Sequence, residues 1–185
     1  MRALAGPRPF GYTPAMTVPR FDSLPPRLVP LLILGASLGA LATAYVAQYG
    51  FGLEPCVLCL TQRIPYAVTA VLALIALAVR SSSARVWIVG LSGGLFLIGA
   101  GLAFYHVGVE QHWWASVASC AGKLPLDLSA ADLKSGLAMK PPKPCDVVDW
   151  SLFGISIAGY NAIFSLALGL GTVAAAWQMT RGRTG

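Results

Sequence analysis

The chain has 185 residues, of which 56% are hydrophobic and 11% are charged, and its formal net charge at pH 7 is +6. Soluble domains carry about 25% charged residues, so a chain with so few lacks the polar surface that a water-soluble fold needs. The composition argues against an ordinary soluble domain and favours a membrane protein with one domain.

Residues 1–28 are rich in proline and arginine. They lack the apolar core and the small-residue cleavage site of a secretory signal peptide. We expect them to form a disordered cytoplasmic tail, matched by a short cytoplasmic tail over residues 180–185.

Four runs without charged residues follow the first tail: Leu28–Leu53, Ile64–Val79, Val86–Val109 and Trp150–Thr180. A membrane-spanning helix needs about 20 mostly apolar residues, which three of the runs provide outright. The second run is shorter, so its helix must begin near Pro55 and include Arg63. The sequence therefore predicts an all-α membrane protein. Its transmembrane domain, over 29–179, is a bundle of four transmembrane helices at roughly 29–49, 56–79, 86–107 and 152–178.

Charged residues outside the apolar runs are distributed unevenly. The tails and the short SSSA turn after the second helix carry eight arginines and one aspartate: Arg2, Arg8, Arg20, Arg27, Arg80, Arg85, Arg181, Arg183 and Asp22. The segment between the third and fourth helices instead carries four lysines and five acidic residues. Because positively charged loops stay in the cytoplasm, both termini and the SSSA turn are predicted to be cytoplasmic. The loops around 50–56 and 108–151 would face outward.

The long outward loop, 108–151, contains the stretch LSAADLKSGLAMK. Ser129 precedes Asp132 by three residues, as in a helix cap, and the leucines and the methionine could form one apolar face. We expect a short amphipathic helix on the outer leaflet. A poorly ordered loop with one helical turn is the alternative. Glu110 and His112, at the start of the loop, are expected to be solvated.

All four cysteines, Cys56, Cys59, Cys120 and Cys145, fall on the predicted outward side. In a bacterium that side is the oxidising periplasm, where disulfides persist. Four cysteines allow three pairings, and the spacing favours Cys56 with Cys59 and Cys120 with Cys145. One alternative is a structural zinc site, which usually shows two short-spaced pairs. The other is two inert disulfides, which suits Cys56–Cys59 poorly because so small a loop gives little stabilisation.

The stretch EPCVLCLTQRIPY places the C-x-x-C pair at the start of the second helix. Pro55 suits a first helical turn, so both thiols would lie near the positive end of the helix dipole, which favours thiolate. Arg63 follows Cys59 by four residues, and its cation would stabilise the same thiolate or an adjacent anion. A charge in the apolar layer usually marks a functional site. Snorkelling of Arg63 to the headgroups is the alternative.

These features resemble the DsbB family, membrane quinone reductases that reoxidise periplasmic thiol oxidases. The resemblance covers roughly residues 30–178 and leaves out the N-terminal tail. Its residues are PCVLC with Arg63, FYHVGVEQHWW before Cys120 and PCDVVDWSLFGIS around Cys145. Gln62 stands where some members have a glutamate.

The resemblance implies a redox route through four cysteines in the bacterial inner membrane. A soluble, reduced thioredoxin-fold oxidase (DsbA-like) would attack the Cys120–Cys145 disulfide at Cys120. Thiol–disulfide exchange would then carry the electrons to Cys56 of the Cys56–Cys59 pair. Cys59 would reduce a membrane quinone, ubiquinone or menaquinone. Arg63 would orient the quinone oxygen and stabilise its developing charge.

Other polar residues in the helices are candidates for supporting roles. His106, expected to end the third helix, could contact the quinone or relay a proton, or it could face water. Asn161 is expected to make a hydrogen bond between helices, and Gln62 could act in the same way or as a partner in the site. Gly35 and Gly39 of GASLG suggest close helix packing.

Two other functions compete with the quinone reductase. One is a transmembrane reductant carrier, which would need thiols accessible from the cytoplasm, where this sequence has none. The other is a membrane assembly factor whose four cysteines bind a metal. The residues predict no metal, and metal analysis of the purified protein separates this class from the redox enzymes.

Overall fold

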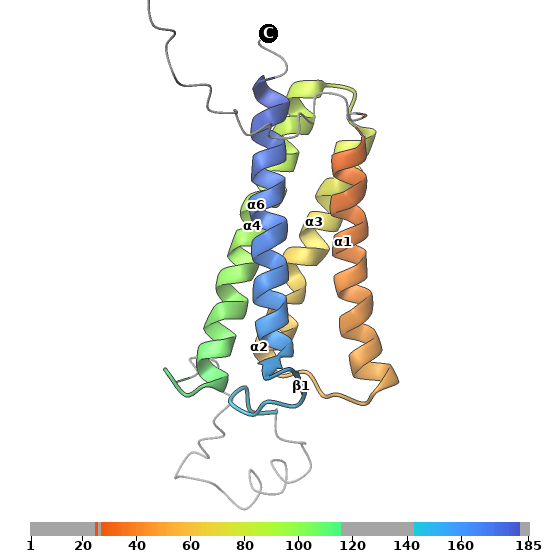
Figure 1. The fold of residues 1–185 in the computed structure, drawn as a ribbon. Coiled ribbons are helices and arrows are strands. Elements are labelled where there is room, and N and C mark those ends of the chain that lie inside the picture. The colour runs from red at the N-terminus through yellow and green to blue at the C-terminus, as the bar shows by residue number, and fades with distance from the viewer. Residues whose placement is uncertain (1–24, 26, 116–142, 182–185) are drawn as a thin grey trace, which may run out of the picture.

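The computed structural model describes residue 25 and residues 27–115 and 143–181. Within them, four helical segments are long and apolar enough to cross a membrane: Leu28–Gly50, Val57–Ala78, Ser82–Glu110 and Ile157–Arg181. They run alternately up and down as a bundle (Figure 1). The predicted all-α membrane fold is therefore confirmed. The N-terminal tail, Cys120 and the amphipathic helix expected after Ser129 lie outside the described residues.

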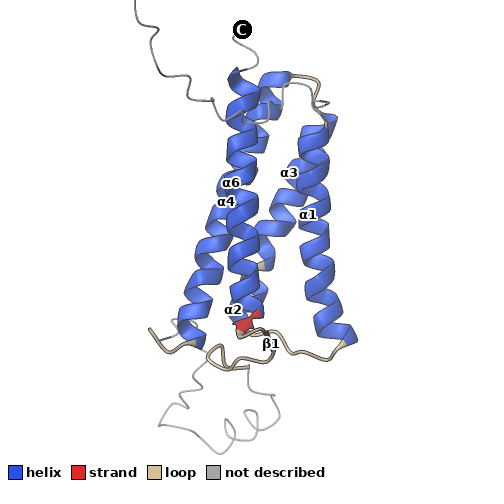
Figure 2. Cartoon of the chain, viewed as in Figure 1, coloured by secondary structure: helices blue, strands red, loops and turns tan. Residues whose placement is uncertain are grey.

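The spans consist of the following elements: α1 Leu28–Tyr45 with a π-helical end η2 Val46–Gly50, α2 Val57–Thr61, α3 Arg63–Ala78, α4 Ser82–Glu110 and α6 Ile157–Arg181. The described residues contain one further regular element, a two-stranded antiparallel hairpin of β1 Ser151–Leu152 and β2 Ile155–Ser156 (Figure 2). Its tip, Phe153 and Gly154, has φ angles of 51° and 77°. This hairpin starts where the fourth helix was expected to start, so α6 begins several residues later than predicted.

The second span is broken at Gln62, between α2 and α3. Pro65 explains the break, because it has no backbone N–H to donate to the carbonyl of Thr61 and its ring crowds that carbonyl. The break lies between Cys59 and Arg63. The two residues therefore do not share one regular helix, as the prediction of a common face assumed.

Close packing between helices occurs at glycines other than the predicted ones. A side chain at Gly93 would collide with Val173, and one at Gly169 would collide with Leu97, so α4 and α6 approach closely there. Gly35 and Gly39 face open space among the described residues. The small residue that packs is Ser37, between them, which is fully buried and hydrogen-bonded to Thr69 of α3 at 2.9 Å. The expectation of close packing at Gly35 and Gly39 is therefore wrong.

Arg85 does not flank a turn, as expected, but lies in the first part of α4 and is only 7% exposed. Its Nε donates to Ala76 O at 3.1 Å and its Nη2 donates to Val79 O at 2.6 Å. These carbonyls belong to the C-terminal end of α3, where they lack partners within the helix. Arg85 therefore caps one transmembrane helix from the start of the next.

We expect Arg85→Ala to lower the free energy of unfolding in detergent by about 2–3 kcal/mol, since hydrogen bonds to a charged group contribute about 1.5–3 kcal/mol. The measurement is denaturant unfolding followed by circular dichroism. Arg80→Ala is the matched control, because Arg80 lies nearby and is exposed, and its loss should change stability by about 0.5 kcal/mol or less. Equal losses in the two variants would contradict the capping role.

Candidate active site

Cys56 and Cys59 lie at one end of the bundle, at the start of α2. Cys56 is the N-cap residue, with extended backbone (φ −74°, ψ 172°), and its Sγ accepts a hydrogen bond from Cys59 N–H at 3.3 Å. The Cys56 thiol donates to Cys59 Sγ at 3.1 Å. Cys56 is buried, whereas Cys59 is partly exposed. The two sulfurs are therefore adjacent but differ in accessibility.

Cys145, from the segment before β1, is buried beside this pair. It belongs to one apolar cluster with Cys56, Leu58 and Val109, and Cys59 packs against that cluster. Three of the four cysteines that the sequence singled out are thus brought together by the fold. The fourth, Cys120, lies outside the described residues, so its pairing with Cys145 stays a prediction.

His106 projects into the bundle and is only 4% exposed. It lies one turn before the end of α4, not at the helix end as expected. Its Nε2 is 3.6 Å from Cys56 Sγ, and its Nδ1 is 2.8 Å from Gln62 Nε2. The histidine therefore faces the buried cysteine, and the possibility that it merely faces water is excluded.

Gln62 links this histidine to a buried polar chain across three helices. Its Oε1 accepts from Asn161 Nδ2 of α6 at 2.5 Å, which confirms the predicted interhelical role of Asn161. Asn161 Oδ1 in turn accepts from Tyr66 O–H at 2.6 Å, and Tyr66 O–H is also 2.6 Å from Ser165 Oγ. Tyr66 and Ser165 were not singled out from the sequence, because each is unremarkable in a membrane helix until the packing places it.

Glu110 is not solvated, as expected, but has a side chain only 7% exposed. One oxygen accepts from Ser156 Oγ at 2.5 Å, and the other lies 3.9 Å from His106 Nε2. Ser156 also accepts from Gly159 N–H, at the start of α6. The carboxylate is buried because the hairpin before α6 folds back onto the end of α4. His112 is exposed, as expected.

Arg63 is the first residue of α3 and contacts η2 and α1. Its guanidinium donates to Gln48 Oε1 at 2.8 Å and lies over the Tyr45 ring, 4.9 Å from the centroid. The side chain is partly exposed, and Leu60 and Ile64 beside it in the chain are exposed. Stabilisation of the Cys59 thiolate by Arg63 stays a prediction.

The electrostatics of Cys56 distinguish it from an ordinary surface thiol. The hydrogen bond to Cys59 and burial raise the pKa of Cys56 to about 12, although the hydrogen bond with His106 acts in the opposite direction. Cys56 therefore stays a thiol at neutral pH while it donates to Cys59. Any negative charge that the pair carries is favoured on Cys59, the partly exposed member.

Two kinds of ligand fit parts of this site. The ligand atoms of Cys56, Cys59 and His106 lie within 4.8 Å of one another, close enough to hold one metal ion. The donors of Arg63, with the exposed Leu60 and Ile64 close to it in the sequence, would suit a lipid-soluble molecule with a carbonyl oxygen.

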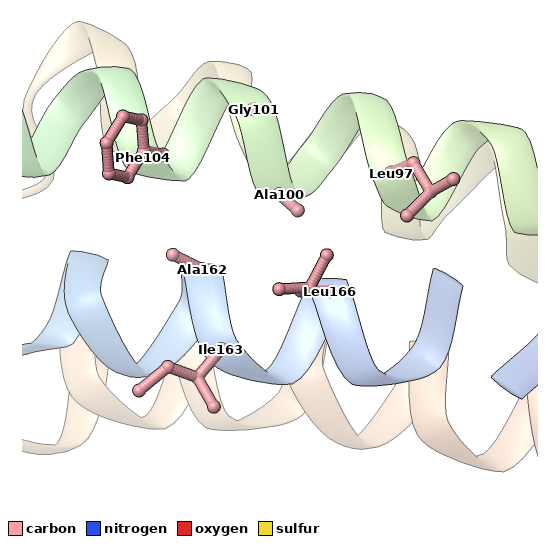
Figure 3. Close-up of a pocket in the computed structure, with 7 residues that line it drawn as sticks. All are labelled: Leu97, Ala100, Gly101, Phe104, Ala162, Ile163 and Leu166. Carbon is pink, nitrogen blue, oxygen red and sulfur yellow. The ribbon is translucent and has the colours of Figure 1, made fainter. Parts of the chain in front are cut away.

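A separate groove between α4 and α6 is lined only by apolar side chains, including Leu97, Phe104 and Ile163 (Figure 3). None of the cysteines, histidines or arginines discussed above lines it. The groove therefore offers packing surface but no reactive group.

Comparison with known proteins finds a family model that matches most of the sequence. The family described as "Disulfide bond formation protein DsbB" matches residues 26–175. "Disulfide bond formation protein B" of a Polaromonas species is 31% identical over 154 residues, 81% of this chain and 89% of the relative. The protein of the same name from Xylella fastidiosa is 32% identical over 140 residues, 71% and 79% of the two chains. An uncharacterized protein of Rickettsia prowazekii is 30% identical over 144 residues, 77% and 83% of the two chains. No solved structure matches significantly.

Proposed function

The chain belongs to the DsbB family of disulfide bond formation proteins, and from that premise we propose that it is an inner-membrane thiol:quinone oxidoreductase. It is a multi-pass membrane protein with disulfide oxidoreductase activity. In the proposal it reoxidises a periplasmic, thioredoxin-fold DsbA-like oxidase and passes the electrons to ubiquinone or menaquinone. Both termini are cytoplasmic, and the cysteines face the periplasm.

The observation that carries the proposal is the burial of Cys145 in the same cluster as Cys56 and Cys59. A loop cysteine packed against the C-x-x-C pair can exchange disulfides with it without a large rearrangement. In the proposed route, two thiols of the partner become a disulfide and the Cys120–Cys145 disulfide is reduced. The loop thiols then reduce Cys56–Cys59 through Cys56 and become a disulfide again.

Within the pair, the partly exposed Cys59 is the cysteine that passes electrons to the quinone. The reduced pair would give two electrons and two protons to a quinone and become a disulfide. Arg63 supplies planar N–H donors for a quinone oxygen, and Gln48 and Tyr45 hold the guanidinium in place. The exposed Leu60 and Ile64 allow approach from the lipid. In this proposal Arg63 binds and orients, Cys59 reacts and Cys56 exchanges with the loop.

Membrane vesicles of the two orientations test the function and the sidedness together. Right-side-out vesicles that contain the protein should reduce an added ubiquinone analogue when a reduced DsbA-like partner is supplied outside. Sealed inverted vesicles should not, because the partner cannot reach the cysteines. Vesicles without the protein give the background rate. Activity only in inverted vesicles would overturn the orientation, and activity in neither would overturn the function.

A metal-binding assembly factor is the second candidate, favoured by the spacing of Cys56, Cys59 and His106. Cysteine sulfur and imidazole nitrogen are the ligands that zinc prefers. Metal analysis of the reduced, purified protein, combined with the vesicle assay, separates the two. A stoichiometric metal with no quinone reduction would support the assembly factor, whereas quinone reduction by metal-free protein would exclude it.

A further inference from the structure

Buried side chains form a series of hydrogen bonds from Ser165 to Cys56, and the donors in this series lie on the Ser165 side. We propose that Gln62, oriented by Asn161, fixes His106 as the neutral tautomer with its proton on Nε2, so that His106 donates a hydrogen bond to Cys56 Sγ. Gln62 is then a positioning residue that acts on the cysteine pair through His106. The tautomer assignment follows from the hydrogen bonds alone. Only its expected effect on the reaction rate rests on the proposed function.

At one end of this series, Cys56 fixes the direction of the hydrogen bonds. A thiol has one hydrogen, and Cys56 donates it to Cys59 Sγ at 3.1 Å. Toward His106 Nε2, 3.6 Å away, the Cys56 sulfur can therefore only accept. Glu110 Oε1, 3.9 Å from the same nitrogen, is also an acceptor. His106 also makes a hydrogen bond with the backbone of Cys145. Cys56 Sγ and Glu110 Oε1 both require a donor at Nε2, so we place the proton there.

In the middle of the series, the side-chain amides of Gln62 and Asn161 fix the direction of the hydrogen bonds. An amide oxygen only accepts and an amide nitrogen only donates. Asn161 Nδ2 donates to Gln62 Oε1 at 2.5 Å, which leaves Gln62 Nε2 to face His106 Nδ1 at 2.8 Å. Nδ1 must then accept, and a neutral imidazole that accepts at Nδ1 carries its proton on Nε2. The middle of the series thus gives the same tautomer as the Cys56 end.

The Ser165 end of the series agrees with the same arrangement. Tyr66 donates to Asn161 Oδ1 at 2.6 Å, and Ser165 Oγ lies 2.6 Å from Tyr66 O–H and 3.4 Å from Asn161 Oδ1. With the asparagine amide reversed, Tyr66 would donate to Ser165, and the buried serine hydroxyl would have to turn to a backbone carbonyl, as Ser92 does to Ile88 O. In the observed arrangement Asn161 Oδ1 accepts from Tyr66 at 2.6 Å and from Ser165 at 3.4 Å.

The consequence for the reaction concerns Cys56 as a leaving group. In the exchange step, the second loop cysteine attacks the mixed disulfide between the first loop cysteine and Cys56. The loop disulfide forms, the bond to Cys56 breaks, and the electron pair stays on Cys56 sulfur. A hydrogen bond from His106 Nε2–H favours that charged sulfur. Among the described residues, the other charged or titratable groups around it are Cys59, Cys145, Tyr105 and Glu110.

Nitrogen NMR of the imidazole tests the assignment directly. The chain has two histidines, and His112→Gln leaves His106 as the only source of imidazole signals in protein labelled with 15N-histidine. We expect the reduced protein in detergent to show a protonated Nε2 and an unprotonated Nδ1. In Gln62→Glu, where the carboxylate can only accept, the proton should move to Nδ1. Gln111→Glu, an exposed glutamine near the site, is the matched control and should leave the spectrum unchanged.

A proton on Nδ1, or an equal mixture of tautomers, in the protein with Gln62 intact would overturn the proposal without any variant at Gln62. The kinetic readout is separate. Gln62→Glu should lower kcat by about tenfold, the effect of one hydrogen bond, and leave the KM for quinone unchanged. A change in KM alone would also overturn the proposal. Because the NMR result does not require turnover, failure of the tautomer assignment is distinguishable from failure of the proposed function.

Discussion

Cys59→Ser should abolish catalytic reduction of quinone. A serine hydroxyl cannot form a disulfide with Cys56, so the variant has no pair that can take electrons from the loop and release them to the acceptor. The rate should fall by on the order of a thousandfold or more, as for loss of an essential nucleophile. The measurement is the absorbance of a ubiquinone analogue in the presence of excess reduced DsbA-like partner.

The same variant should keep one oxidising equivalent per chain, because the loop disulfide does not depend on Cys59. In the absence of quinone, oxidised wild-type protein should oxidise two equivalents of partner, from its two disulfides, and Cys59→Ser should oxidise one. Free-thiol titration of the partner measures this difference. It also separates a specific loss of the acceptor step from misfolding, which would remove both equivalents.

Thr61→Ser is the matched control for Cys59→Ser. It places a serine in the same short helix, and the hydroxyl can keep the bond that Thr61 makes to Val57 O at 2.9 Å. Its quinone reduction should stay close to that of the wild type. If Cys59→Ser protein turned over quinone at a similar rate, Cys59 would not be the cysteine that delivers the electrons, and the buried Cys56 would have to take that role.

The membrane helices of this protein, and the position of its C-x-x-C pair at the start of one of them, could be predicted from its sequence. Hydrophobic runs of sufficient length specify membrane helices by composition alone, and C-x-x-C is recognisable by its spacing. The break at Gln62 could also have been predicted, because Pro65 removes a hydrogen bond to Thr61 wherever the helix lies. The start of α6 was placed too early because the hairpin at 151–156 contains no charged residue and has the composition of the helix that follows it.

The polar contacts could not be predicted, because each depends on which helix faces which. Gln62 and Tyr66 are far in the sequence from His106 and Asn161, and the four meet only when α3, α4 and α6 are packed. The burial of Glu110 depends on the hairpin before α6, and that of Arg85 on the end of α3. Small residues likewise show that a helix can pack closely, but not on which side. This is why Gly93 and Gly169, rather than Gly35 and Gly39, mark the close contact.

Arg63→Met should raise the KM for quinone and lower kcat, while the protein still inserts and folds. Loss of one charge-assisted hydrogen bond to the bound quinone should cost about 1.5–3 kcal/mol, or roughly tenfold to a hundredfold in kcat/KM. Methionine keeps an apolar side chain of comparable length, so the contact with the Tyr45 ring can be retained in part. Steady-state titration of a ubiquinone analogue, with the partner held in excess, measures both constants.

Two further variants separate the charge of Arg63 from its placement. Arg63→Lys should recover only part of the loss, because an ammonium does not reproduce the planar pair of donors. Gln48→Leu should raise KM less than Arg63→Met, because it keeps the guanidinium but removes its acceptor on η2. Arg80→Met is the matched control: it removes an exposed arginine at the other end of α3 and should change neither constant. Unchanged kinetics in Arg63→Met would mean that the arginine only extends to the headgroups, and the quinone contact would then have to come from His106.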